Sequence, residues 1–399
     1  MNSHPRKQAT SQPPRSLERG VTLIELMVAL VLALLIIAAV GYVYLQGSQG
    51  FRVQDSQSRM QEDARFIIDT VGRDVRVAGA FGCNLPRETG MTLSGKPSTS
   101  IELIASQPIM TQASVGTGWL MMSGVDTTPA DRYIDLQYVL RGFSPTAAAT
   151  AAPLPSYIQG ASRQPGTDVL MIMRTGEDAR SIVSSTETTL TMDGFLTPAN
   201  KDYPVLAVSD CRETKIIKPT MTGAATGPVL LKVENGMNKN NNAPSGQVDE
   251  LRAAFGKSGT PTVSHFEPVL YYVAAPTPTG LRSSLHRVGI ANDSTNWGGW
   301  EGTGGAIIAS GVESFNLSFV LSGDPMVAKE YTMAEMEANP SRWAAVTAVR
   351  LQFTLSAESD GTALTAQSNV TGGPARADKR LVQRYDVTLG ASSRQNPRN

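Results

Sequence analysis

The side chain in the most unusual chemical setting is Glu25, a carboxylate placed directly before a long apolar run. Residues 26–45 are 20 consecutive residues without a charge. As a helix rising about 1.5 Å per residue, this run spans about 30 Å, the thickness of a bilayer hydrocarbon core. A carboxylate at the edge of such a segment costs free energy unless a positive charge meets it. We therefore expect Glu25 to neutralise a cation within the membrane region.

Few other side chains could carry covalent or metal chemistry. Of the three histidines, His4 lies near the start of the chain, whereas His265 and His286 lie in strand-like runs without a recognisable catalytic signature. This count leaves little for a metal site with several ligands. The chain also has no phosphate-binding glycine loop, no G-x-S-x-G and no zinc signature. The sequence thus predicts no enzyme, no metal and no cofactor.

The element that must position Glu25 is a membrane-crossing helix over residues 21–45. The preceding residues 1–20 are polar and carry four basic side chains against one acidic side chain, a net charge of +3 that should stay cytoplasmic. The rest of the chain should then lie outside the cytoplasm. A secretory signal peptide is one alternative, but its apolar region usually holds 7 to 15 residues. A plain membrane anchor is another, and it leaves Glu25 unexplained.

Beyond the membrane run, residues 51–80 are predicted to continue as an amphipathic helix. Six apolar residues recur there at spacings of 3 and 4, which places them on one helix face. These residues are Met60, Ala64, Ile67, Val71, Val75 and Ala78. Gly79 and Gly82 end the pattern, and the glycines at 41, 47 and 50 could let the helix bend between its halves. This half should pack on a globular region.

From residue 81 onward the apolar period changes from 3.6 to 2, which predicts strands. Strand-like runs are 134–140, 169–173, 205–208, 269–273, 312–321, 346–355 and 385–389. A loop-like segment near 238–246 suggests two β-rich lobes, 81–237 and 247–390, or else one extended sheet system with long insertions. Residues 391–399 form a polar tail. The expected fold class is α+β, with a long N-terminal helix packed on a β-rich region.

The chain holds only two cysteines, Cys83 and Cys211, and both follow the membrane segment. On an oxidising face of the membrane they would most simply form one disulfide. Such a bond closes a loop of about 129 residues, and the chain-entropy model assigns it roughly 4 to 5 kcal/mol. Two buried free thiols are the alternative.

Composition excludes one broad function class. The 35 basic and 35 acidic residues balance among 399, so there is no electrostatic reason to expect general nucleic-acid binding. A basic stripe would have to arise from local clustering.

The run over residues 19–27, RGVTLIELM, resembles the class III signal of type IV prepilins and type II secretion pseudopilins. The resemblance implies that a prepilin peptidase cleaves after Gly20 and that Val21 becomes the N-methylated first residue of the mature chain. Val21 departs from the Phe that is usual there. The resemblance also places Glu25 at the fifth mature position, where it would pair with the α-amino group of a neighbouring subunit.

Later stretches resemble the PilW family of type IV pilus minor pilins. They occur in the family's order at 77–83, 208–211, 311–315, 346–351 and 380–382. This resemblance implies a minor pilin that primes pilus assembly and sits at or near the tip. Its partners would be other minor pilins, the major pilin, a tip adhesin and the prepilin peptidase, and its locations the inner membrane and the surface pilus. The alternatives are a J-type minor pseudopilin of a type II secretion system and a binding module such as an adhesin or DNA-uptake pilin.

Overall fold

The computed structural model describes one long helix and a set of β-sheets. It covers residues 22–80, 101–105, 119–121, 133–135, 139–145, 158, 162–185, 189–194, 206–209, 214–218, 220–222, 228–232, 261–277, 282–289, 305–321, 329–358 and 380–391. Two compact units divide the chain, Met1–Asp55 and Ser56–Asn399. The described structure is therefore an N-terminal helical segment and a larger unit that holds all the strands.

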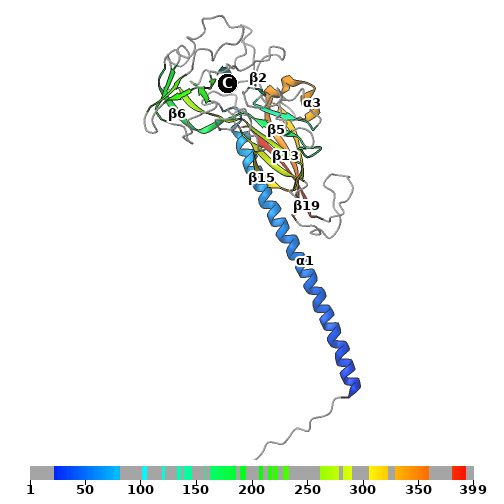
Figure 1. Cartoon of the computed structure of the whole chain (residues 1–399). Coiled ribbons are helices and arrows are strands. Elements are labelled where there is room, and N and C mark those ends of the chain that lie inside the picture. The colour runs from blue at the N-terminus through cyan, green and yellow to red at the C-terminus, as the bar shows by residue number, and fades with distance from the viewer. Residues whose placement is uncertain are drawn as a thin grey trace, which may run out of the picture. The chain divides into compact units, whose positions relative to one another are not determined.

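Helix α1 (Leu23–Arg76) is continuous through all three glycines that could have bent it (Figure 1). All six residues of the predicted apolar stripe are buried, each 3% exposed or less. The helix ends where the sequence suggested, because Gly79 takes a positive φ of 76° that favours glycine and stops helical propagation. The prediction of an amphipathic second half is confirmed.

Among the strands that the structure describes, the pairings are antiparallel except that of β1 with β9, which is parallel. One sheet has the order β1 (Ile101–Ala105), β9 (Thr214–Lys218), β8 (Leu206–Ser209), β12 (Thr262–Phe266), β6 (Thr175–Ser185), β7 (Thr189–Met192), β11 (Val229–Lys232), β10 (Thr220–Thr222). A second has the order β15 (Ala306–Ser310), β14 (Ser284–Val288), β13 (Val269–Ala274), β5 (Val169–Ile172), β4 (Leu140–Phe143).

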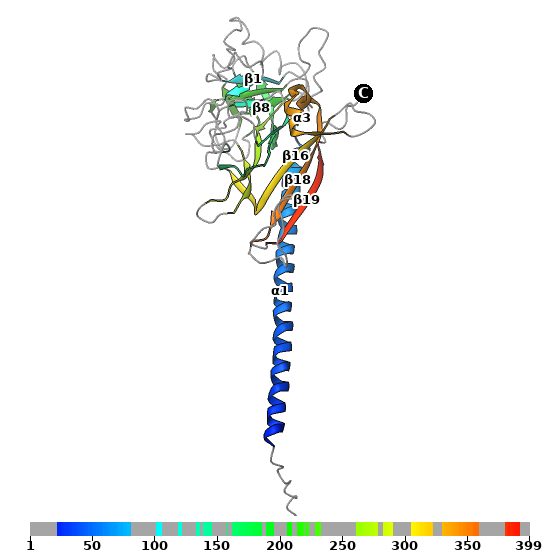
Figure 2. The ribbon, with the colours of Figure 1, turned by 90° about the vertical axis from the view of Figure 1, so that its right-hand side faces the viewer.

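A third, four-stranded sheet runs β17 (Glu330–Thr332), β16 (Val312–Leu321), β18 (Val346–Ser356), β19 (Val382–Gly390), and Figure 2 shows three of these strands side by side. Strands β2 (Trp119–Met121) and β3 (Tyr133–Asp135) form a separate pair. Between β17 and β18 lie helix α3 (Met333–Glu337), which starts with a capping box at Thr332, and the 3-10 helix η5 (Pro340–Ala345).

Six of the seven strand-like runs form strands. The prediction of one strand over 134–140 is wrong. This run contributes to two strands of different sheets, because β3 pairs with β2 while β4 pairs with β5. Apolar alternation alone could not show that the run divides between two strands, because the residues of both strands follow the same two-residue period. Residues 136–138 lie outside the described ranges.

Strands from both predicted lobes pair with one another. Strand β12 lies between β8 and β6, and β13 pairs with β5. Such pairing fits the arrangement of one sheet system with insertions. The boundary at 238–246 lies outside the described residues, so the division into two lobes stays a prediction.

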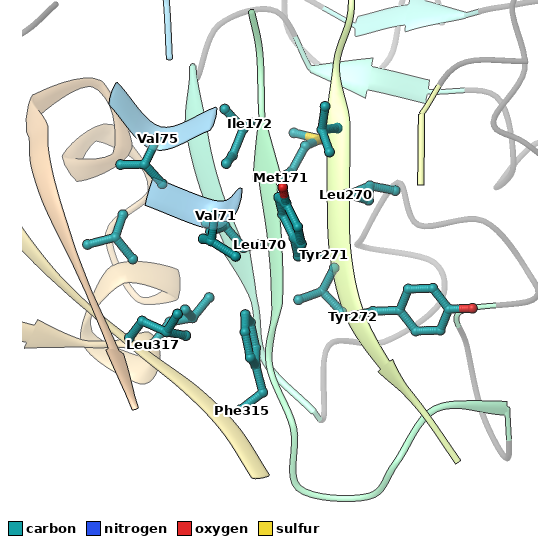
Figure 3. Close-up of a cluster of buried hydrophobic side chains, with 14 of the residues drawn as sticks. Val71, Val75, Leu170, Met171, Ile172, Leu270, Tyr271, Tyr272, Phe315 and Leu317 are labelled. Atoms are coloured by element: carbon teal, nitrogen blue, oxygen red, sulfur yellow. The ribbon is translucent and has the colours of Figure 1, made fainter. Parts of the chain in front are cut away.

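The core forms where the second half of α1 meets the five-stranded and four-stranded sheets. Figure 3 shows Val71 and Val75 of α1 facing side chains of β5, β13 and β16. Strand β5 is buried along its whole length, and Phe315 and Leu317 of β16 are at most 5% exposed. The expected α+β fold, an apolar N-terminal helix plus a β-rich region, is confirmed.

Candidate functional site

The N-terminal end of α1 is the first candidate site. Thr22 caps the helix: its carbonyl oxygen accepts from the amide of Leu26 at 3.1 Å and its hydroxyl accepts from the amide of Glu25 at 3.3 Å. Glu25 therefore lies in the first turn, where a carboxylate interacts favourably with the positive end of the helix dipole. Gly20 and Val21 lie just before the described residues, so the predicted cleavage and methylation positions remain predictions.

Behind Glu25 the helix surface is apolar on every side. The large apolar residues between 23 and 45 are 54% to 78% exposed. Among the described residues, α1 is the helix long and apolar enough to cross a membrane. Tyr42 and Tyr44 lie near the end of this segment, as aromatic residues do at membrane–water interfaces, and the Tyr42 hydroxyl accepts from Gln46 at 2.6 Å. The arrangement can bind lipid chains or other apolar helices.

The other end of α1 carries a second site, an ionic anchor around Asp74 that the sequence analysis missed. The Asp74 side chain is only 5% exposed. Its Oδ2 accepts from the Tyr271 hydroxyl at 2.5 Å and from Arg287 Nε at 2.9 Å, and its Oδ1 lies 3.4 Å from Arg174 Nη1. Arg174 also pairs with Glu267 at 2.7 Å. The anchor thus joins the last turns of α1 to β13 and β14 and to the residue before β6.

The electrostatics of this anchor follow from burial and the Asp74 charge. Burial raises the pKa of Tyr271, and the neighbouring Asp74 carboxylate raises it further, so the phenol stays protonated as a donor. Burial lowers the pKa of Arg287, but its hydrogen bond and attraction to Asp74 outweigh burial and raise it. Tyr271 and Arg287 therefore stay protonated near neutral pH and act as donors to Asp74.

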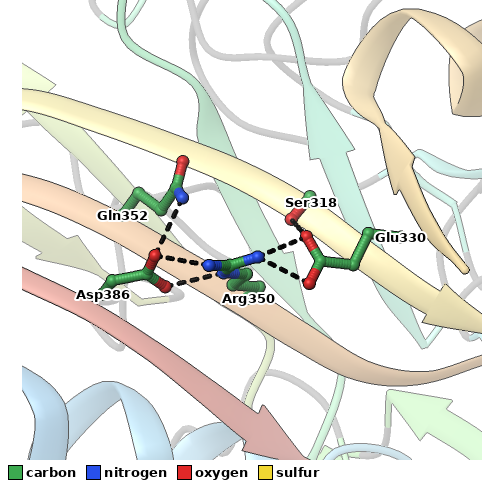
Figure 4. Close-up of polar contacts among 5 residues, drawn as sticks. All are labelled: Ser318, Glu330, Arg350, Gln352 and Asp386. Carbon is green, nitrogen blue, oxygen red and sulfur yellow. Dashed lines mark hydrogen bonds and ion pairs between the residues drawn. The ribbon is translucent and has the colours of Figure 1, made fainter. Parts of the chain in front are cut away.

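A second ionic network lies on the outer face of the four-stranded sheet (Figure 4). Arg350 of β18 contacts both oxygens of Glu330 at 2.6 Å and both oxygens of Asp386, at 2.7 and 2.6 Å. Gln352 and Ser318 donate to the same two carboxylates. One guanidinium thereby bridges β17 and β19, but its partial exposure makes the network a modest contributor to stability.

The remaining predicted site residues give no catalytic constellation within the described ranges. Burial lowers the pKa of His265 in β12 to about 4, so it is neutral at pH 7, and His286 of β14 packs beside Tyr272. No group of three potential metal ligands occurs among the residues that the structure describes. Cys83 and Cys211 lie outside them, so the disulfide is a prediction.

The sequence pattern around Asp74 does not indicate that this residue is buried. Asp74 sits between Val71 and Val75 on the flank of the apolar stripe, a position that usually faces water. Its partners Tyr271 and Arg287 lie 197 and 213 residues further along the chain. Only the pairing of distant strands brings them together.

Comparison with known proteins agrees with the N-terminal features. The prokaryotic N-terminal methylation motif matches residues 15–41, which include Gly20, Val21 and Glu25. No curated protein matches the chain. A similar solved structure is the type IV-like pilin TTHA1219 from Thermus thermophilus, with 14% sequence identity and a TM-score of 0.18 over 33% of this chain and 67% of that one.

The methylation motif therefore covers the segment in which a capped helix start, the first-turn carboxylate and the exposed apolar surface occur together. A β-rich region follows the same helix. Residues 15–41 of the chain therefore carry the prokaryotic N-terminal methylation motif at the start of this helix.

Proposed function

We propose that this protein is a minor pilin of the PilW type, which primes assembly of a type IV pilus and is incorporated at or near its tip. The observation that carries the proposal is the start of α1: a carboxylate in the first helical turn, followed by apolar side chains exposed in all directions. An apolar helix surface of this kind needs lipid before assembly or other helices after it.

In the proposed pathway the prepilin peptidase cleaves after Gly20 and exposes the α-amino group of Val21, which is then methylated. The new cation and Glu25 each cost free energy in an apolar environment, and pairing them between neighbouring subunits offsets part of both costs. Glu25 therefore favours association of this subunit with a partner whose N-terminus lies at the matching depth.

The proposed partners are other minor pilins, the major pilin, a tip adhesin and the prepilin peptidase. The proposed locations are the inner membrane, with the β-rich region periplasmic, and the surface pilus. The role is structural, without catalysis, cofactor or nucleic acid. A Cys83–Cys211 disulfide would stabilise the periplasmic region by closing a long loop.

Mass spectrometry of the mature protein, combined with the Gly20→Arg substitution, tests the processing step. The wild-type chain is expected to begin at Val21, and Gly20→Arg is expected to leave the full precursor in the inner membrane, because a long charged side chain should not fit beside the scissile bond. A mature protein that begins elsewhere would exclude the assignment.

Deletion of the gene tests the assembly role. Loss of surface pili with normal protein secretion is expected. Loss of secretion with normal piliation would instead identify a J-type minor pseudopilin, and unchanged piliation and secretion would reject both assembly roles.

A further inference from the structure

Asp168 lies directly before β5 and ties the five-stranded sheet to the four-stranded sheet. It is 5% exposed. Its amide donates to the carbonyl oxygen of Phe315 at 2.8 Å, and its Oδ2 accepts from the amide of Leu317 at 2.8 Å. Both partners belong to β16. Asp168 thus makes two hydrogen bonds to the backbone of β16, with its amide as a donor and its side chain as an acceptor.

The charged groups around Asp168 compensate its negative charge poorly. Arg163 is 8% exposed, and its Nη2 donates to the carbonyl oxygens of Ser144 and the following residue at 3.2 and 2.6 Å. On the side of α3, Glu337 adds a second carboxylate, whose Oε1 accepts from the amide of Ser144. Strand β16 contributes only a backbone donor to the carboxylate. In the described part of the chain, no cation lies within ion-pair distance of Asp168.

A buried carboxylate with one backbone donor and a second carboxylate nearby favours the protonated form. Burial, the largest cause, raises the pKa of Asp168 to about 6. The hydrogen bond from Leu317 and the charge of Arg163 lower it, and Glu337 raises it.

We propose that Asp168 is a proton-linked clasp between the two sheets: in mildly acidic surroundings it takes up a proton, and the junction becomes more stable. The inference concerns the β-rich region alone and does not depend on the proposed role in pilus assembly. A protein region outside the cytoplasm meets the pH of its surroundings directly, so such a clasp would stiffen the junction in acid.

The direction follows from proton linkage. The pKa of Asp168 is about 6 in the folded chain and 3.8 for an unperturbed aspartate, so the folded state binds more protons between these values. The stabilisation is complete below pH 3.8 and is lost as the pH rises through 6. From pH 7.5 to pH 5.0 this carboxyl raises the folding equilibrium constant about tenfold.

Urea unfolding of the full chain in detergent micelles, at pH 7.5 and pH 5.0, tests the clasp with Asp168→Asn. Asparagine keeps an acceptor for the Leu317 amide but cannot take up the proton. From pH 7.5 to pH 5.0 the folding equilibrium constant of the variant is expected to rise about tenfold less than that of the wild-type chain. Asp69→Asn, at a carboxylate whose side chain is 63% exposed, is the matched control and should retain the wild-type pH dependence. An unchanged pH dependence in Asp168→Asn would overturn the proposal.

Hydrogen exchange in the wild-type chain gives a readout that needs no substitution. After correction for the intrinsic exchange rate, protection of the Leu317 amide is expected to rise about tenfold from pH 7.5 to pH 5.0. Glu337→Gln removes the neighbouring negative charge and should shift this rise to lower pH. Protection that is flat or falls on acidification rejects the clasp, even if Asp168→Asn does not fold.

Discussion

The two halves of α1 differ in both apolar content and surroundings: residues 23–45 are almost all apolar, whereas fewer than half of residues 51–76 are. Between residues 23 and 45 the large apolar side chains are at least 54% exposed, whereas the stripe from Met60 to Ala78 is at most 3% exposed. In the first half the apolar residues surround the helix, and in the second the buried apolar residues share one face. The amount and the period of the apolar residues together therefore indicate whether a helix packs on its own chain or needs lipid or another subunit.

The charged residues follow the same contrast. Within the described ranges the Glu25 amide donates to the Thr22 hydroxyl, and the proposed assembly role gives its side chain a partner in another subunit. Asp74, near the other end of the helix, has Tyr271, Arg287 and Arg174 around it. One carboxylate is proposed to act in assembly, and the other is held by contacts within the fold.

Substitution of Glu25 should produce the largest effect. The absence of an effect would contradict the proposed contrast between Glu25 and Asp74. Glu25→Leu removes the charge but keeps an apolar helix, so insertion and cleavage should survive, while attraction to the Val21 amine of a neighbour is lost. We expect loss of surface pili in cells that depend on this subunit for initiation, measured by electron microscopy and shear recovery.

Two further substitutions separate charge from shape. Glu25→Ala should behave like Glu25→Leu if charge is the cause, and Glu25→Asp, with its shorter reach, should be intermediate. Wild-type piliation in Glu25→Leu at normal expression would show that charge pairing has no role in this subunit.

Local pattern was enough to predict α1, its buried stripe and six of the described strands, because these depend on residues a few positions apart. The stripe over 60–78 follows the 3.6-residue period, and the strand over 346–355 appears as β18 with one more residue. Sheet order could not be predicted in this way. Strand β12 reaches β6 across some 80 residues, and no short-range signal encodes such a pairing.

The candidate sites divide along the same line. Glu25 was found because a charge beside a long apolar run is unusual within its own neighbourhood. Asp74 and Asp168 were missed because each is one of many acidic residues until distant strands bury it. A buried polar residue with distant partners is visible only in the folded chain.

Substitution of Asp74 should have the next largest effect and would sharpen the contrast between the two carboxylates. Asp74→Ala leaves Arg287 and Tyr271 without their buried acceptor, which should cost about 3 to 5 kcal/mol in the free energy of unfolding. Urea unfolding of the full chain in detergent measures it. Asp69→Ala is the control, because its exposed pair with Arg73 at 3.2 Å should contribute only about 0.3 to 0.5 kcal/mol. Equal losses in the two variants would show that Asp74 is not an anchor.

The smallest expected effect compares one isoleucine from each half of the helix. Ile67 is fully buried and Ile37 is 66% exposed. Removing one methylene by Ile67→Val should lower the free energy of unfolding of the β-rich region by about 0.5 to 1.5 kcal/mol, because the core around it relaxes only partly. Ile37→Val removes the same group from an exposed side chain, so the unfolding midpoint of the β-rich region in detergent should stay at the wild-type value. Both variants keep helix propensity and β-branching almost unchanged, so a difference between them reports packing alone. If Ile37→Val lowers the midpoint as much as Ile67→Val, the first half of α1 contributes to the core and the two halves are not independent in their packing.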